Sequence, residues 1–171
     1  MNRFMLPVLL SLISVPCLAA VTEPAGISPK LRPPADEQPA FILGAKGVQV
    51  YSCKSRASDY AWSFVAPEAA LLEGAATAGR HFAGPTWESS SDRSSVKGAV
   101  RERQDGGAGN IPWLLLAATP SGSDGKFAGV TSIQRVATQG GIEPKEACDA
   151  SKVDQEVRVP YTANYYFYKR K

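Results

Sequence analysis

The sequence predicts an all-β protein, either a single antiparallel β-sandwich or a closed β-barrel of about eight short strands. Segment after segment is short, rich in Val, Ile, Tyr, Trp and Phe, and bounded by Gly, Pro, Ser or Asp, which indicates strands joined by turns. No long stretch has the 3.6-residue periodicity of an amphipathic helix. Short strands at this spacing are typical of both architectures, so the choice between them stays open.

The clearest alternation of apolar and polar residues lies in YAWSFVA (60–66) and EVRVPY (156–161), as expected for strands with one buried face. In contrast, IPWLLLAAT (111–119) has no alternation, which indicates a strand buried on both faces. The other predicted strands cover residues 48–53, 68–72, 96–103, 127–137 and 165–169.

The chain divides into three predicted segments. Residues 1–20 resemble a secretory signal peptide, because Arg3 precedes an apolar run of about eleven residues that ends in small residues. Residues 21–40 contain five of the thirteen prolines, which indicates a linker or an arm that lies along the domain. Residues 41–171 form the predicted all-β domain. We therefore expect a secreted or periplasmic protein, and we expect it to be a monomer.

The cysteines predict one disulfide. Cys17 leaves with the signal peptide, so Cys53 and Cys148 remain in a compartment where thiols are oxidised, and the simplest outcome is a bridge between them. The alternative is two separate buried thiols.

Several kinds of chemistry are excluded or disfavoured by composition. A single histidine leaves no imidazole pair for a metal site, and we expect neither a metal nor a cofactor. The formal charge of +3 comes largely from the last three residues, Lys169 to Lys171, so no broad basic surface for nucleic acid is expected. The apolar run near the N-terminus is shorter than the roughly twenty residues of a membrane span, and no later segment approaches that length.

The stretch RHFAGPTWE (80–88) holds the candidate ligand site. Gly84 and Pro85 predict a bend that carries His81 and Trp87 on adjoining extended arms, and Glu88 would raise the pKa of His81 if the two side chains were close. Alternatively, Trp87 packs in the core and His81 forms a hydrogen bond across a strand pair. The same choice between an exposed aromatic platform and core packing applies to all three tryptophans, Trp62, Trp87 and Trp113.

Five motifs in a fixed order resemble a known family. GRHFAGPTWE, IPWLLLAAT, AGVTSIQRVATQGG, CDA and VPYTANYYFY are similar to those of an uncharacterised family of exported bacterial and fungal proteins, known only as a domain of unknown function. The resemblance implies export and supports the pairing of Cys53 with Cys148. Some fungal relatives carry a malate dehydrogenase label, but GGAGNIP (106–112) does not form the GxGxxG turn that opens a helix in dinucleotide-binding folds.

We interpret the chain as an exported, non-enzymatic binding or surface-structural module. Its expected ligand is a small molecule, a glycan or another component of the cell envelope, bound near His81, Trp87 and Glu88. One alternative is a hydrolase that uses His81 as acid or base with Glu88 as its orienting carboxylate. A second alternative is a purely structural extracytoplasmic protein.

Overall fold

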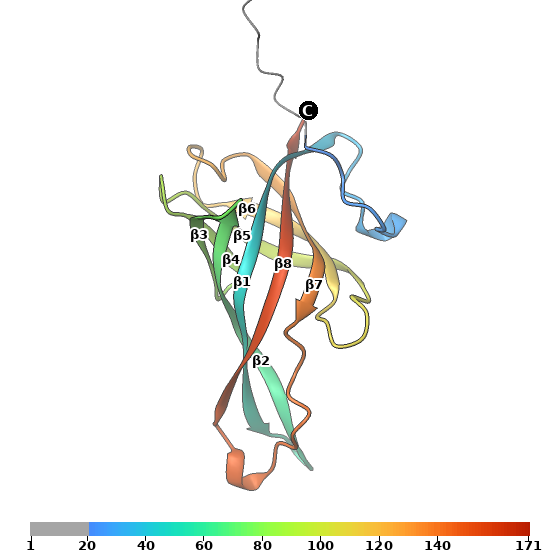
Figure 1. The fold of residues 1–171 in the computed structure, drawn as a ribbon, viewed down its shortest axis with the longest axis vertical. Helices are drawn as coiled ribbons and strands as arrows, with labels where there is room; N and C mark the ends of the chain where they lie inside the picture. The colour runs from blue at the N-terminus through green and yellow to red at the C-terminus, as the bar shows by residue number, and fades with distance from the viewer. Residues whose placement is uncertain (1–20) are drawn as a thin grey trace, which may run out of the picture.

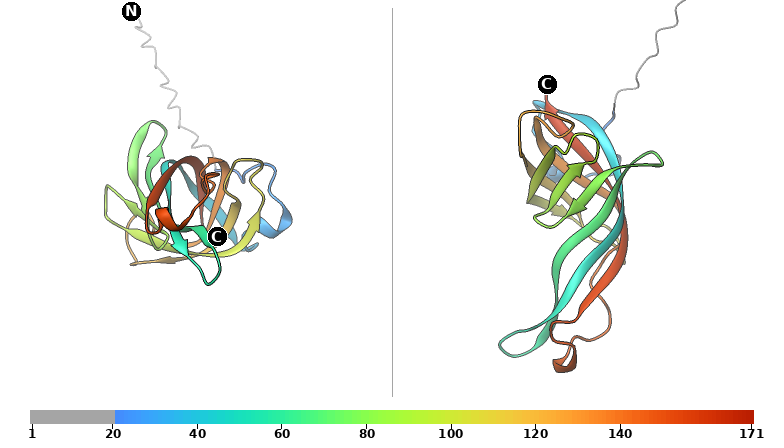
Figure 2. Two further views of the ribbon diagram at one scale, coloured as in Figure 1. Left: turned by 90° about the horizontal axis from the view of Figure 1, so that it is seen from below. Right: turned by 90° about the vertical axis from the view of Figure 1, so that its left-hand side faces the viewer.

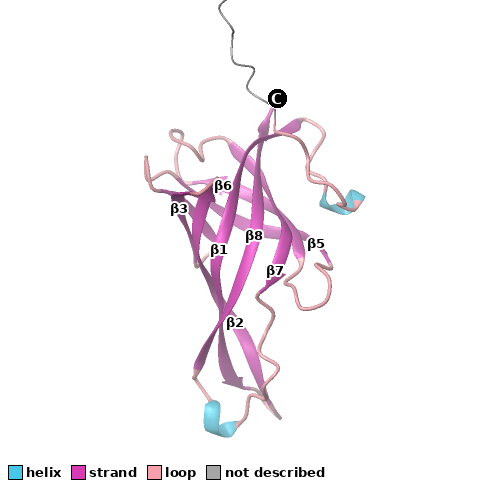
Figure 3. Ribbon diagram, in the orientation of Figure 1, coloured by secondary structure: helices cyan, strands magenta, loops and turns pink. Residues whose placement is uncertain are grey.

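The computed structural model describes residues 21–171, and the predicted signal peptide lies outside them. Its strands form one antiparallel sheet that closes in a ring, in which β1 pairs with both β2 and β8 (Figure 1). The strands are β1 (Glu37–Ser55), β2 (Tyr60–Glu73), β3 (Ala76–Phe82), β4 (Thr86–Ser89), β5 (Ser95–Gln104), β6 (Trp113–Pro120), β7 (Val130–Gly140) and β8 (Glu156–Arg170). Within residues 21–171 the helical elements are two short 3-10 turns, η1 (Pro29–Leu31) and η2 (Ala150–Lys152) (Figure 3). The all-β prediction is therefore confirmed, and the sheet is single and closed.

The strands β1, β2 and β8 are much longer than predicted, at 19, 14 and 15 residues. The predicted strands 60–66 and 68–72 are one strand that runs through Pro67. The predicted strands 156–161 and 165–169 are likewise one strand, which contains Pro160 and continues through residues 162–164. At each proline the strand pairs with β1 on one side, and the residues that pair with β3 or β7 on the other side come later in the strand. Proline lacks an N–H donor and is tolerated at such edges, so these residues do not end the strands.

Three long strands project from the ring and form a stem, which we define as residues 48–67 and 141–160. Figure 1 and the right-hand view of Figure 2 show β1, β2 and β8 continuing well past the other strands. The segment between β7 and β8 descends beside them. Because only three strands continue into it, the stem has a small apolar cluster of its own, which comprises Tyr51, Cys53, Trp62, Cys148, Val157 and Val159.

The segment between β7 and β8 is attached to the stem by hydrogen bonds and by a disulfide. The Tyr51 hydroxyl donates a hydrogen bond to the carbonyl of Gly141 (2.7 Å), and Trp62 Nε1 donates to the carbonyl of Glu146 (2.8 Å). The Cys53–Cys148 disulfide also joins the two, and it confirms the predicted pairing. These contacts hold the segment against the stem.

The main core fills the interior of the ring. Leu43, Leu71, Val96, Ile133 and Phe167 are almost completely buried there and come from five different strands. Among residues 21–171, no helix has the length and hydrophobicity that a membrane crossing requires.

The N-terminal segment packs on the outside of the sheet before β1 begins. Leu31 is fully buried, and its carbonyl accepts a hydrogen bond from Nε2 of Gln134 on β7 (2.6 Å). The Tyr168 hydroxyl of β8 donates to the same Gln134 side chain. This segment therefore covers the outer face of β7 and β8, while their other face lines the interior.

Candidate functional site

The stretch RHFAGPTWE forms the β3–β4 hairpin, as its Gly-Pro bend predicted. Gly84 adopts φ +120° in the turn, a conformation that favours glycine. The turn is closed by the Thr86 hydroxyl, which donates to the carbonyl of Ala83 (3.0 Å). As a result, His81 lies directly opposite Trp87 in the strand register.

His81 and Trp87 are stacked on each other inside the closed sheet. Their ring centroids are 4.2 Å apart with an interplanar angle of 12°. The Tyr165 ring on β8 lies edge-to-face with both, at centroid distances of 5.2 Å. His81 is 3% exposed and Trp87 is 1% exposed. Offset and edge-to-face contacts of this kind stabilise aromatic clusters beyond simple burial.

The environment of His81 keeps its imidazole neutral. Burial is the main cause that lowers its pKa to about 3, the positive charge of Arg135 lowers it further, and the hydrogen bond to Thr86 partly offsets both. Because Nδ1 lies 2.8 Å from the Thr86 carbonyl, which can only accept, the proton is on Nδ1 and Nε2 carries the lone pair. At neutral pH the ring is therefore an acceptor at Nε2.

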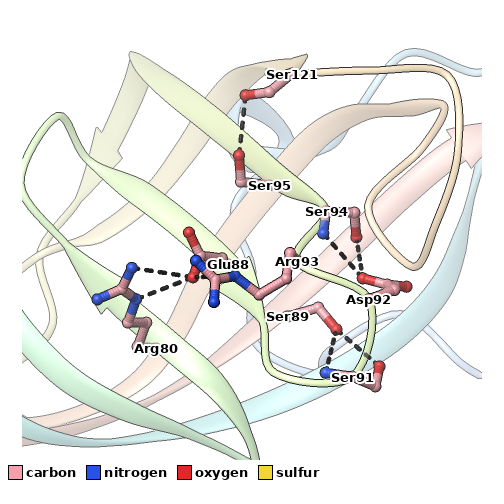
Figure 4. A network of polar contacts seen from close by, with 9 residues as sticks. All are labelled: Arg80, Glu88, Ser89, Ser91, Asp92, Arg93, Ser94, Ser95 and Ser121. Carbon is pink, nitrogen blue, oxygen red and sulfur yellow. Dashed lines mark hydrogen bonds and ion pairs between the residues drawn. The ribbon is translucent and has the colours of Figure 1, made fainter.

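Glu88 lies away from His81. Trp87 points into the core, so the next residue of the strand points to the opposite face. There the Glu88 carboxylate pairs with Arg80 (3.0 Å) and with Arg93 (3.6 Å) (Figure 4). The structure thus brings together two of the three predicted site residues, and the carboxylate that the hydrolase alternative requires is engaged elsewhere.

The loop that follows Glu88 is held by its own polar network, also drawn in Figure 4. Asp92 accepts hydrogen bonds from the backbone N–H (2.9 Å) and the hydroxyl (2.7 Å) of Ser94. These bonds, with one from the backbone of Lys126, hold the pKa of Asp92 well below its usual range. The network orders the loop and does not include His81 or Trp87.

A cavity of about 360 Å³ opens beside His81 and Trp87, at the junction of the ring and the stem. This volume is within the range of small-molecule sites, about 300 to 1,000 Å³. Most of the lining is aromatic or aliphatic and every strand of the ring contributes to it. The lining residues are Gln49, Tyr51, Phe64, Pro67, His81, Pro85, Trp87, Val100, Arg103, Ile111, Pro112, Leu114, Leu116, Arg135 and Tyr165.

Three lining residues carry buried polar atoms without a partner among residues 21–171: Gln49 Nε2, Trp87 Nε1 and the Tyr165 hydroxyl. The Tyr165 hydroxyl is near enough to Tyr161 and Arg135 for both to affect its pKa, but it forms no hydrogen bond of normal geometry with either. Buried polar atoms are normally paired by protein, water or a ligand. Three residues of the cavity wall therefore carry polar groups that no described protein atom pairs.

The strand register places two arginines on the interior face. Leu114 of β6 lies opposite Arg103 on β5 and opposite Arg135 on β7, and Arg135 lies opposite Tyr165 on β8. Directly opposite residues of a sheet share a face. Arg135 is half-buried, and its Nε and Nη2 donate to the carbonyl of Pro112 (3.1 and 2.9 Å).

Gly98 makes room for the Trp87 indole, and we expect Gly98→Ala to destabilise the fold by roughly 1 to 3 kcal/mol. A Cβ at this position would lie 2.9 Å from both Trp87 Cζ3 and Leu116 Cδ2. Gly44→Ala in β1 is the matched control, because its Cβ would meet no atom closer than 3.7 Å. Urea unfolding measures both variants. Equal stabilities would contradict the close packing at Trp87.

Sequence reasoning found His81 and Trp87 but missed Gln49, Arg103, Arg135 and Tyr165. One available signal was the run SIQR, in which alternation places Arg135 on the same face as the apolar Ile133. Within residues 21–171, no group of three or more His, Cys, Asp or Glu side chains is placed to hold a metal ion.

The fold and the cavity define a class of protein: a closed, eight-stranded antiparallel sheet with an interior ligand-sized cavity. The chain belongs to the family described as "Protein of unknown function (DUF3455)", which it matches over residues 34–169. This match confirms the resemblance to an uncharacterised family that the sequence motifs indicated. Comparisons with curated proteins and with solved structures find no match.

Proposed function

We propose that this protein is an exported binding module that takes a small organic molecule into the cavity beside His81 and Trp87. The observation that carries the proposal is the cavity itself, whose walls are mostly apolar and include Gln49 and Trp87, each with a buried polar atom that has no partner among residues 21–171. A cavity with apolar walls and a few polar groups is the usual form of a small-molecule site. The buried state of His81 and Trp87 supports a role in the cavity wall and not in an exposed surface.

The cavity mouth also supports this proposal. Phe64 and Val100 both line the cavity and remain 54% and 44% exposed. Exposed apolar side chains beside a cavity often mark the place where a ligand enters. By contrast, none of the three tryptophans is exposed, which favours an enclosed ligand over a glycan stacked on a flat aromatic platform.

Binding of an uncharged naphthalene probe, N-phenyl-1-naphthylamine, tests the proposal. We expect saturable binding with one site per chain, seen as probe fluorescence excited by energy transfer from tryptophan. Phe64→Ser is expected to weaken binding roughly three- to tenfold, because the ring loses its apolar contact with the probe.

Val65→Ser is the matched control for this measurement. Val65 is the next residue of β2 and is 49% exposed, but it does not line the cavity. It should therefore bind the probe as the unmodified protein does. Equal losses in both variants, or fluorescence that rises without saturation, would refute binding in the cavity.

A further inference from the structure

The residues that line the cavity carry several hydrogen-bond donors. Gln49 Nε2 and Trp87 Nε1 are N–H donors without a partner among the described residues. Burial raises the pKa of the Tyr165 hydroxyl, so this group also keeps its proton and can donate. His81 Nε2 is a neutral acceptor, and no Asp or Glu lines this cavity in the part of the chain that the structure describes.

The two arginines add positive charge that no ion pair among residues 21–171 neutralises. Neither Arg103 nor Arg135 takes part in the ion pairs formed among residues 21–171. The acidic side chain that affects the wall is Glu143, which is exposed and raises the pKa of Tyr51. Placing an uncompensated guanidinium in a partly buried site is costly unless a partner supplies the opposite charge.

The geometry allows both arginines to approach one group. They flank Leu114 on neighbouring strands, so their backbones are about 10 Å apart, twice the spacing between strands. A guanidinium has five N–H groups, and Arg135 uses two nitrogens on Pro112, which leaves several N–H groups free. Arg103 is exposed at the mouth.

We infer that the cavity binds an organic anion, a small molecule with an apolar body and one carboxylate or sulfonate-type group held by Arg103 and Arg135. The apolar body would lie against Trp87, Phe64 and the aliphatic wall. Charge-assisted hydrogen bonds to arginine are stronger than neutral ones, so the acidic group supplies much of the affinity. This inference rests on the proposed function of the cavity.

A pair of probes that differ by one sulfonate tests it. N-phenyl-1-naphthylamine is uncharged, and 8-anilinonaphthalene-1-sulfonate is its anionic counterpart. We expect the folded protein to bind the anionic probe at least tenfold more tightly than the neutral probe. Decanoate is likewise expected to displace the neutral probe at a lower concentration than decan-1-ol does, which extends the result from sulfonates to carboxylates.

Arg103→Gln and Arg135→Gln are each expected to reduce the preference for the anionic probe roughly tenfold. Arg103→Gln is the main variant, because the Arg103 side chain is exposed and takes part in none of the ion pairs among residues 21–171. Arg101→Gln is the matched control, since Arg101 is exposed on the same strand and does not line the cavity. Melting temperatures confirm that each variant is folded.

The possible outcomes separate the two proposals. If neither probe binds the unmodified protein, the cavity is not a binding site and the proposed function fails. If the neutral probe binds and the anionic probe binds no more tightly, binding stands and anion selectivity fails. A preference for the anion that survives both Arg103→Gln and Arg135→Gln would also overturn the inference, because other groups would then hold the charge.

Discussion

Reducing the Cys53–Cys148 disulfide is expected to lower the free energy of unfolding by about 4 to 5 kcal/mol. The bridge joins residues 95 positions apart, and a crosslink over so long a loop strongly restricts the unfolded chain. Cys53 is also completely buried beside Trp62, so the stem loses packing when the bridge opens. Urea unfolding with and without dithiothreitol measures the difference.

The double variant Cys53→Ala/Cys148→Ala shows whether dithiothreitol reaches the buried sulfurs. It is expected to have the stability of the reduced protein and to be insensitive to the reductant. If the double variant and the reduced protein both unfold at the urea concentration of the oxidised protein, the bridge contributes nothing and the expectation is wrong.

Acidification is expected to cost stability through His81 well before the carboxylates titrate. The folded-state pKa of His81 is about 3, whereas the unfolded value is about 6.5. Above pH 6.5 neither state binds the proton. Between the two values only the unfolded chain binds it, so stability is present above pH 6.5 and falls by up to about 1.4 kcal/mol per pH unit below it. The accumulated loss near pH 4 is on the order of a few kcal/mol.

His81→Phe isolates this effect, because a phenyl ring can stack on Trp87 and does not titrate. The pKa values of Glu68 and Asp92 are lowered by hydrogen bonds to Arg158 and Ser94, so these carboxylates also reduce stability in acid. Their loss begins only as the pH falls below their unfolded pKa of about 4. Urea unfolding from pH 7.5 to 4.5 should therefore show a steep slope in the unmodified protein and a flat one in His81→Phe. Identical slopes would contradict the buried, neutral imidazole.

The hairpin that carries His81 and Trp87 could be predicted because all of its determinants are local. Gly84 and Pro85 fix the bend, and because Phe82 pairs with Thr86, the next residues outward, His81 and Trp87, lie opposite each other. The outward direction of Glu88 could also have been predicted, since adjacent residues of a strand face opposite sides. The prediction of one site formed by His81, Trp87 and Glu88 did not take this alternation into account.

The arginine pair could not be predicted, because its position depends on long-range register. A bulge between Val100 and Glu102 shifts the alternation of β5 just before Arg103, and the row that joins Arg103 to Arg135 passes through Leu114 on a third strand. A bulge reverses which side chains face inward, and its position is set by pairing with distant segments. The lengths of β2 and β8 were also missed, since Pro67 separated two predicted strands of β2 and the unassigned residues 162–164 separated two predicted strands of β8.

Those two prolines have a consequence for how the molecule behaves beside its own copies. A long strand with a free edge is a template on which another chain can add by backbone hydrogen bonding, which is how many β proteins aggregate. Pro67 and Pro160 each remove an N–H donor from the outer strands of the stem. The row of backbone hydrogen-bonding groups along the outer strands of the stem is therefore interrupted, so a neighbouring chain cannot add to it as a continuous strand.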